Sequence, residues 1–250
     1  MKKLLIILSG IILFNNLCAN ENLKSTLDTA FNHYLNENYT EAINIYDSIY
    51  LQGNSSAELF YNMGNCYYKI GDIANAIYFY EKAKILNPND KDIKHNLNIA
   101  NQSIKDNIET IPEIFYMLWY HSIESLMSSD AWLITSIIIF IISLILLSYY
   151  LFSRKIIIRK IGFIVGITCL ILSVVCFLLS KNGAKKITDS PYAIVFESSL
   201  IKSSPNEGGI NLFEVNEGLK VEIINTVNSW NNIRLSDGKE GWIQGYKVKK

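Results

Sequence analysis

Two long stretches without any charged residue limit the fold of this chain more than any other feature. Residues Ala131–Phe152 and Ile161–Leu179 are each long enough to cross, as a helix, the roughly 30 Å hydrocarbon core of a membrane. Two buried core helices are the alternative, but a soluble domain seldom needs two such runs back to back. The pattern therefore predicts a transmembrane hairpin with helices at 131–152 and 161–180.

A basic loop at residues 153–160 indicates the orientation of this hairpin. It carries four cations: Arg154, Lys155, Arg159 and Lys160. Upstream of the loop, no Lys or Arg occurs between Lys105 and Arg154. The positive-inside rule places such a loop in the cytoplasm, so both flanking regions are expected outside it.

The N-terminus predicts the same orientation independently. Residues 1–19 combine a basic start with a short apolar run, which is typical of a secretory signal peptide, and we expect cleavage after Ala19. Lipidation of Cys18 is the alternative. It is disfavoured because Leu17 is bulky where lipoprotein signals carry a small residue.

Residues 20–110 contain a repeat with a period of 34, which is the length of a tetratricopeptide (TPR) unit. At this shift Ala42 aligns with Ala76, and Tyr46 aligns with Tyr80. Small residues are expected where paired helices approach closely, aromatic residues between the helices, and a proline at the helix end. The predicted packing positions are Ala30, Ala42, Tyr46, Gly64, Tyr67, Ala76, Tyr80 and Pro88. A helix near 90–106 would cap the array.

Stacked repeats leave a concave face, which is a binding surface for peptides. Helical spacing and the shift of 34 predict which side chains line it: Phe31, Tyr34, Glu58, Tyr61, Asn65, Tyr68 and His95. Tyrosine supplies contact area and a hydroxyl at low entropic cost. The alternative is that these tyrosines form an ordinary solvated surface. No Lys/Arg cluster is present to capture the carboxylate of an acidic C-terminal peptide.

The connector at residues 111–130 has aromatic residues on one side of a predicted helix, including Trp119. Two readings stay open. The helix could lie in the membrane interface with Trp119 and Trp132 as belt residues, or it could pack under the repeat domain.

After Lys186 the pattern changes to alternating, β-branched residues with turns, which predicts a small all-β barrel at residues 187–250. The segments Lys202–Pro205, Trp230–Leu235 and Asp237–Ile243 resemble bacterial SH3-type domains. Trp230 and Trp242 are expected in the core or rim of this barrel more than as ligand anchors. Such domains bind cell-wall peptides or proteins.

The predicted fold class is thus a multi-domain membrane protein: an α-helical TPR array, a two-helix transmembrane hairpin and a small SH3-like barrel. This order of parts resembles the BatE-type TPR proteins of the Bacteroides aerotolerance (Bat) operon. The resemblance implies an inner-membrane protein that works beside von Willebrand A proteins and a MoxR-type ATPase. It supplies no catalytic residues.

The sequence indicates neither an enzyme nor a nucleic-acid-binding protein. Its 23 basic and 23 acidic residues leave no cationic excess for phosphates. The three histidines lie singly, away from metal-ligand spacings, and no phosphate loop or nucleophile motif occurs. We therefore expect no catalytic site, metal or cofactor.

The net charge of the chain is zero, but it is unevenly distributed along the sequence. Residues 20–130 hold 7 basic and 15 acidic side chains, so this region is acidic. The prediction is an inner-membrane scaffold whose two exported domains bind envelope proteins. A peptidoglycan-binding protein that uses the barrel is the alternative.

Overall fold

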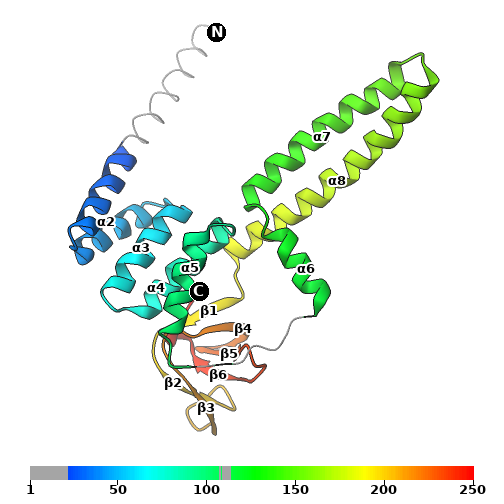
Figure 1. The fold of residues 1–250 in the computed structure, drawn as a ribbon. Helices are drawn as coiled ribbons and strands as arrows, with labels where there is room; N and C mark the ends of the chain where they lie inside the picture. Colours follow the sequence, from blue (N-terminus) through cyan, green and yellow to red (C-terminus); the bar gives the residue numbers. More distant parts are fainter. Residues whose placement is uncertain (1–21, 107, 109–113) are drawn as a thin grey trace, which may run out of the picture.

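The structure is a computed structural model that describes residues 22–106, 108 and 114–250. The predicted signal peptide at 1–19, including Cys18, lies outside these residues. The described chain begins with a helix over residues 22–35 and continues with antiparallel helices, followed by a long hairpin and a sheet (Figure 1). The repeat helices are α2 (Tyr39–Leu51), α3 (Ala57–Lys69), α4 (Ile73–Leu86) and α5 (Lys91–Gln102).

Polar caps define where the repeat helices begin. The side chains of Ser56, Asp72 and Asp90 accept hydrogen bonds from the first backbone N–H groups of α3, α4 and α5. Gly71, with φ of +83°, makes the turn between α3 and α4, where a left-handed backbone favours glycine. These signals reproduce the helix–turn–helix unit that the 34-residue period predicts.

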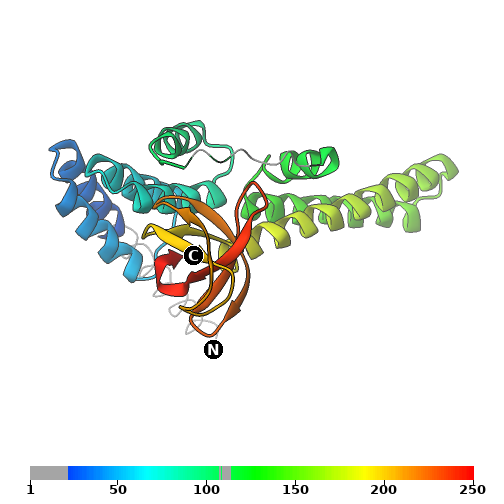
Figure 2. The same ribbon diagram turned by 90° about the horizontal axis from the view of Figure 1, so that it is seen from below.

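The C-terminal region is a seven-stranded antiparallel sheet, and the prediction of a closed barrel is wrong (Figure 2). The strand order is β3-β2-β6-β5-β4-β1-β7, and the edge strands β3 and β7 do not pair with each other in the described structure. The strands are β1 (Tyr192–Val195), β2 (Ser199–Lys202), β3 (Asn211–Val215), β4 (Lys220–Val227), β5 (Trp230–Arg234), β6 (Glu240–Gln244) and β7 (Val248–Lys249).

The repeat domain covers one end of this sheet, which explains why the sheet need not close on itself. Ile194 of β1 belongs to the hydrophobic core of the repeats, and Phe196 packs against Tyr78 of α4. The hydroxyl of Tyr78 donates to the carbonyl of Lys250, beside the two-residue strand β7. An edge that is covered by another element does not need a partner strand.

Polar contacts fix the sheet against the repeats. Asp106 accepts hydrogen bonds of 2.7 Å from both the backbone N–H and the side-chain amide of Asn216. Lys220 of β4 forms an ion pair with Glu81 of α4, with 2.7 Å between Nζ and Oε2. The sheet thus lies on the side of the array that presents α4.

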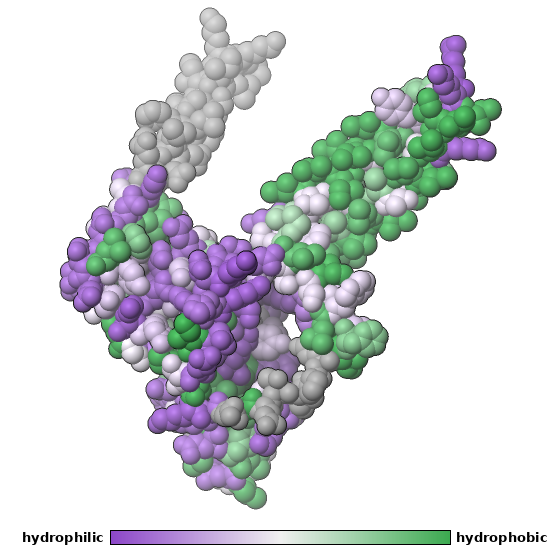
Figure 3. All heavy atoms as spheres, in the orientation of Figure 1, coloured by the Kyte–Doolittle hydropathy of each residue, from purple (hydrophilic) through white to green (hydrophobic). Residues whose placement is uncertain are grey.

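Two long apolar helices form an extended hairpin that projects from these domains (Figure 3). They are α7 (Ser129–Phe152) and α8 (Ile156–Thr188), and both are long and apolar enough to cross a membrane. Arg154 and Lys155 lie between the helices, whereas Arg159 and Lys160 lie at the start of α8 rather than in a loop. All four cations are therefore at the far end of the hairpin.

Small residues allow the two apolar helices to approach closely. A Cβ atom at Gly162 would lie 2.9 Å from the carbonyl oxygen of Leu146, and one at Gly166 would lie 2.9 Å from the Leu147 side chain. Ser136 and Ser173 each donate a hydrogen bond to the other's backbone carbonyl. Small residues and hydroxyl pairs are typical of helix contacts in lipid, where apolar burial gives little driving force.

The connector forms helix α6 (Phe115–Glu124), which exposes most of its aromatic residues. Trp119 is 70% exposed and Phe115 is 81% exposed. One contact joins its C-terminal end to the repeats, because the side-chain amide of Asn89 donates to the carbonyl of Leu126. An exposed aromatic face favours the membrane-interface reading over packing under the repeats.

Candidate functional site

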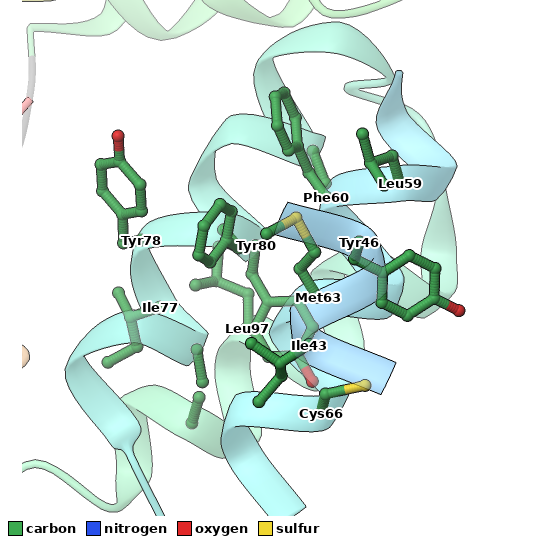
Figure 4. Packing of buried hydrophobic residues seen from close by; sticks show 14 of the residues in the cluster. Ile43, Tyr46, Leu59, Phe60, Met63, Cys66, Ile77, Tyr78, Tyr80 and Leu97 are labelled. Atoms are coloured by element: carbon green, nitrogen blue, oxygen red, sulfur yellow. The ribbon is translucent and has the colours of Figure 1, made fainter. Parts of the chain in front are cut away.

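The packing positions of the repeats hold the concave face in place (Figure 4). Ala30, Ala42, Tyr46, Gly64, Ala76 and Tyr80 are buried. Tyr67 is half-buried and stacks on Phe79, with ring centroids 5.4 Å apart, and the half-buried Pro88 follows the end of α4. A Cβ atom at Gly64 would lie 2.6 Å from the ring of Tyr80, so glycine lets α3 and α4 meet there.

A small cavity of about 210 Å³ opens on the concave face between the helix at residues 22–35, α3 and α5. Seven side chains line it: Tyr34, Asn65, Tyr68, Lys69, Tyr80, Asn96 and Ile99. Three of them, Tyr34, Asn65 and Tyr68, are residues that the sequence predicts in the groove.

A hydrogen-bond network orders the floor of this cavity. The amide of Asn96 donates to the Tyr61 hydroxyl at 3.0 Å and to Oδ1 of Asn65 at 2.9 Å. The same oxygen of Asn65 accepts the hydroxyl of Tyr80 at 2.7 Å. The donors of the Asn65 amide and the carbonyl oxygen of Asn96 are left without a partner among the described residues. The site therefore offers both a donor and an acceptor, which is what a peptide backbone requires.

The other predicted groove residues are placed differently. Tyr61 is half-buried and joins the network from the side, whereas Phe31 and Glu58 are exposed. Phe31 stacks on Tyr34, with ring centroids 6.1 Å apart, and so extends the aromatic surface beyond the cavity. His95 is exposed on α5 and does not line the cavity, since its neighbour Asn96 occupies that place.

Burial keeps Tyr34 and Tyr80 neutral. Burial raises the pKa of Tyr34, and Cys66 and neighbouring tyrosines raise it further. Burial likewise raises the pKa of Tyr80, and the neighbouring Tyr61 raises it further. The hydroxyls therefore act as neutral hydrogen-bonding groups, and Lys69 is the cation that lines the cavity.

We expect the stability of the repeats to fall in alkaline solution, because their buried groups hold protons that the unfolded chain loses. Burial raises the pKa of Cys66 from 9.0 to about 12, and that of Tyr67 from 10.0 to about 12. The contribution is complete below pH 9 and decreases as the pH rises towards 12, by about 1.4 kcal/mol per group and pH unit. Circular dichroism melts at pH 8 and pH 10.5 measure it.

The variant Cys66→Ala separates the thiol from the tyrosines in this experiment. It should remove the part of the decrease that begins near pH 9 and leave the part that begins near pH 10. An unfolding midpoint that stays constant from pH 8 to pH 10.5 would contradict the raised pKa values of Cys66 and Tyr67 in the folded protein.

The two sheet tryptophans occupy different environments. Trp230 is buried at 9% exposure, and Trp242 on β6 is half-buried and pairs in register with Lys202 of β2. Neither belongs to the hydrophobic core cluster of the sheet, which is built from smaller aliphatic residues such as Ile201, Ile233 and Ile243. The histidines His33, His95 and His121 stay separate, and no group of three metal-ligating side chains occurs within the described part of the chain.

Comparison with known proteins supports the repeat assignment. A family model described as Tetratricopeptide repeat matches residues 57–90, which span α3 and α4. No curated protein matches the chain. The chain is thus a TPR-containing protein with two long apolar helices and a C-terminal antiparallel sheet.

Proposed function

We propose that this protein is a membrane-anchored adaptor without enzymatic activity, whose concave TPR face binds a segment of a partner protein. TPR units are protein-interaction modules, so a protein partner is the natural ligand class. The observation that carries the proposal is the amide and tyrosine network around Asn65 and Asn96, which leaves a donor and an acceptor open.

The arrangement of domains supports the same face. The sheet and the root of the hairpin contact α4, which presents its outer side to them. The cavity on the other side is lined by the helix at residues 22–35, α3, α5 and the inward-facing Tyr80 of α4, and none of its lining residues belongs to the sheet or the hairpin. An extended peptide can therefore reach it while the rest of the molecule stays assembled.

The resemblance to BatE-type proteins suggests the setting. We propose an inner-membrane protein of two spans with both folded domains in the periplasm, acting in a Bat-type envelope stress or aerotolerance complex. Its partners would then include von Willebrand A proteins. The support is the order of TPR unit, apolar hairpin and β-sheet domain, together with the four cations at one end of the hairpin.

Crosslinking in membranes tests the binding face. The double variant Tyr68→Ala with Asn96→Ala removes an aromatic wall and the central amide of the site. Asn96 bonds to the half-buried Tyr61 and to Asn65, so its loss leaves no buried group stranded. With about 1 kcal/mol per lost contact, recovery of crosslinked partners should fall roughly tenfold or more.

The matched control is Asn44→Ala, which removes an exposed amide from α2 away from the cavity. Recovery of the same partners should be unchanged, and both variants should melt like the natural protein. Equal recovery from the double variant and the control would remove the groove as the binding site.

A reporter enzyme fused after Lys186 tests the membrane placement. We expect activity from a reporter that works only outside the cytoplasm, because α8 would cross the membrane from the basic end outward. The matched fusion after Arg154, at the opposite end of the hairpin, should be inactive. Activity with the reverse pattern would overturn the two-span topology.

A further inference from the structure

A second and larger cavity, of about 620 Å³, lies on the opposite side of α4 from the concave face. Its walls come from α4, α6, the adjoining ends of α7 and α8, and strands β1, β4 and β7, which converge at the root of the hairpin (Figure 1). We name it the junction cavity. It belongs to neither the predicted groove nor the sheet core.

The junction cavity lies at the level where the apolar part of the hairpin ends. Trp132 near the start of α7 and Leu179 near the end of the charge-free part of α8 are both in its wall. Just beyond these two residues, the Ser129 hydroxyl joins the helices by donating to the carbonyl of Ser180 at 2.8 Å. If the hairpin spans the membrane, as in the proposed function on which this inference rests, lipid headgroups lie at this height.

The charges in the wall favour an anion. Six lysines line the cavity against three carboxylate side chains. Two of the lysines are paired, Lys220 with Glu81 and Lys186 with Glu124. Lys84 and Lys249 form no ion pair within 4 Å among the described residues. Lys249 interacts with the carboxylate of Asp47, which does not line the cavity, and its ammonium lies 4.4 Å from the ring centre of Tyr78.

The wall of the junction cavity also contains a buried hydrogen-bond acceptor that lacks a donor. Glu124 is only 8% exposed, and its Oε2 receives the ammonium of Lys186 at 2.5 Å and lies 3.4 Å from Nδ1 of His121. Its Oε1 is buried and has no hydrogen-bond partner in the described structure. Buried polar atoms are rarely left unpaired, so a bound molecule that donates a hydrogen bond would complete this site.

We propose that the junction cavity binds the headgroup of an aminophospholipid. The phosphate would lie among Lys84, Lys249 and their neighbours, and the primary ammonium would donate to Oε1 of Glu124. The acyl chains would continue along the exposed apolar surface of α7 and α8 (Figure 3). An excess of lysines over carboxylates, together with one unsatisfied carboxylate oxygen, selects a headgroup that carries both charges.

Native mass spectrometry of the full chain in detergent tests this directly. The delipidated protein is titrated with phosphatidylethanolamine, phosphatidylcholine and phosphatidylglycerol. Phosphatidylcholine has no N–H to donate and phosphatidylglycerol has no ammonium, so phosphatidylethanolamine should be retained about tenfold more strongly, as expected for one charge-assisted hydrogen bond. Equal retention of the three lipids would overturn the proposal.

A single variant tests the proposed site of the ammonium group, and a double variant tests the proposed site of the phosphate. Glu124→Gln should abolish the preference for phosphatidylethanolamine and leave retention of the other two lipids unchanged. Lys84→Ala with Lys249→Ala should weaken retention of all three, whereas Lys91→Ala with Lys94→Ala on the exposed face of α5 should change none. If Glu124→Gln fails to fold, the lysine pair decides alone, because unchanged retention there contradicts the site.

The proposals for the groove and for the junction cavity can be disproved independently of each other. The double variant Tyr68→Ala with Asn96→Ala lies on the other side of the array and should retain phosphatidylethanolamine normally. Loss of partner capture with normal lipid retention, or the reverse, therefore distinguishes the proposed function from the lipid site.

Discussion

Gly64→Ala is expected to destabilise the repeat domain by about 3 kcal/mol or more, the upper range for overpacking a core. The added Cβ would lie 2.6 Å from two ring atoms of Tyr80. That ring has no room to move, because it is 1% exposed and its hydroxyl is bound to Asn65. A loss of this size is a large fraction of the 5–15 kcal/mol that stabilises a typical domain. Thermal unfolding followed by far-ultraviolet circular dichroism measures it.

Gly53→Ala is the matched control, because the chemical change is the same and the surroundings differ. Gly53 has φ of +87° with nothing within 4 Å of an added Cβ, so only backbone strain of about 1–2 kcal/mol is expected. A Gly64 variant that melts no lower than the Gly53 variant would show that α3 and α4 are not packed as described.

Gly166→Leu is expected to separate the two apolar helices. A Cβ at this position already lies 2.9 Å from the Leu147 side chain, and the Ser143 hydroxyl donates to the Gly166 carbonyl at 2.8 Å. A branched side chain cannot fit between them, so the hydrogen bonds along the helix contact should be lost. The expected result is a helix pair that no longer holds Ser136 opposite Ser173.

Disulfide trapping detects this separation. Cysteines at Ser136 and Ser173, whose hydroxyl oxygens are 3.4 Å apart, should crosslink readily when Cys169 and Cys176 are replaced by alanine. Adding Gly166→Leu should reduce the crosslinked fraction at least severalfold. Thr168→Leu, which adds bulk on an exposed face of α8, should leave it unchanged. Equal crosslinking in both variants would contradict the close contact.

The helical array was the part of the fold that the sequence predicted best. A repeat supplies its own alignment, so each position in α3 has a known counterpart in the first unit. The shift of 34 also relates His95 of the capping helix α5 to Tyr61, but Asn96 lines the cavity in its place. The capping helix therefore does not keep the phase of the repeat, since one residue on a helix is a rotation of about 100°.

The sheet has features that cannot be predicted from the sequence. Alternating residues identified most of its strands, but β3 and the two-residue β7 gave too weak a pattern. Whether a sheet closes depends on what covers its edges, and here Tyr78 and Ile194 join the sheet to the repeats. Asp106 and Asn216 are 110 residues apart in the sequence, and no local sequence pattern predicts such a contact. The junction cavity also depends on long-range contacts, so it cannot be predicted from the sequence for the same reason.

The length of α8 has a consequence for the partner. This helix is continuous over 33 residues, about 50 Å at 1.5 Å per residue, and its charge-free part ends well before Thr188. About two helical turns therefore project beyond the apolar stretch before β1 begins at Tyr192. If the hairpin spans a membrane, as proposed above, these two turns set the distance between the bilayer and the groove. A partner that binds the groove would then have to present its binding segment close to the membrane surface.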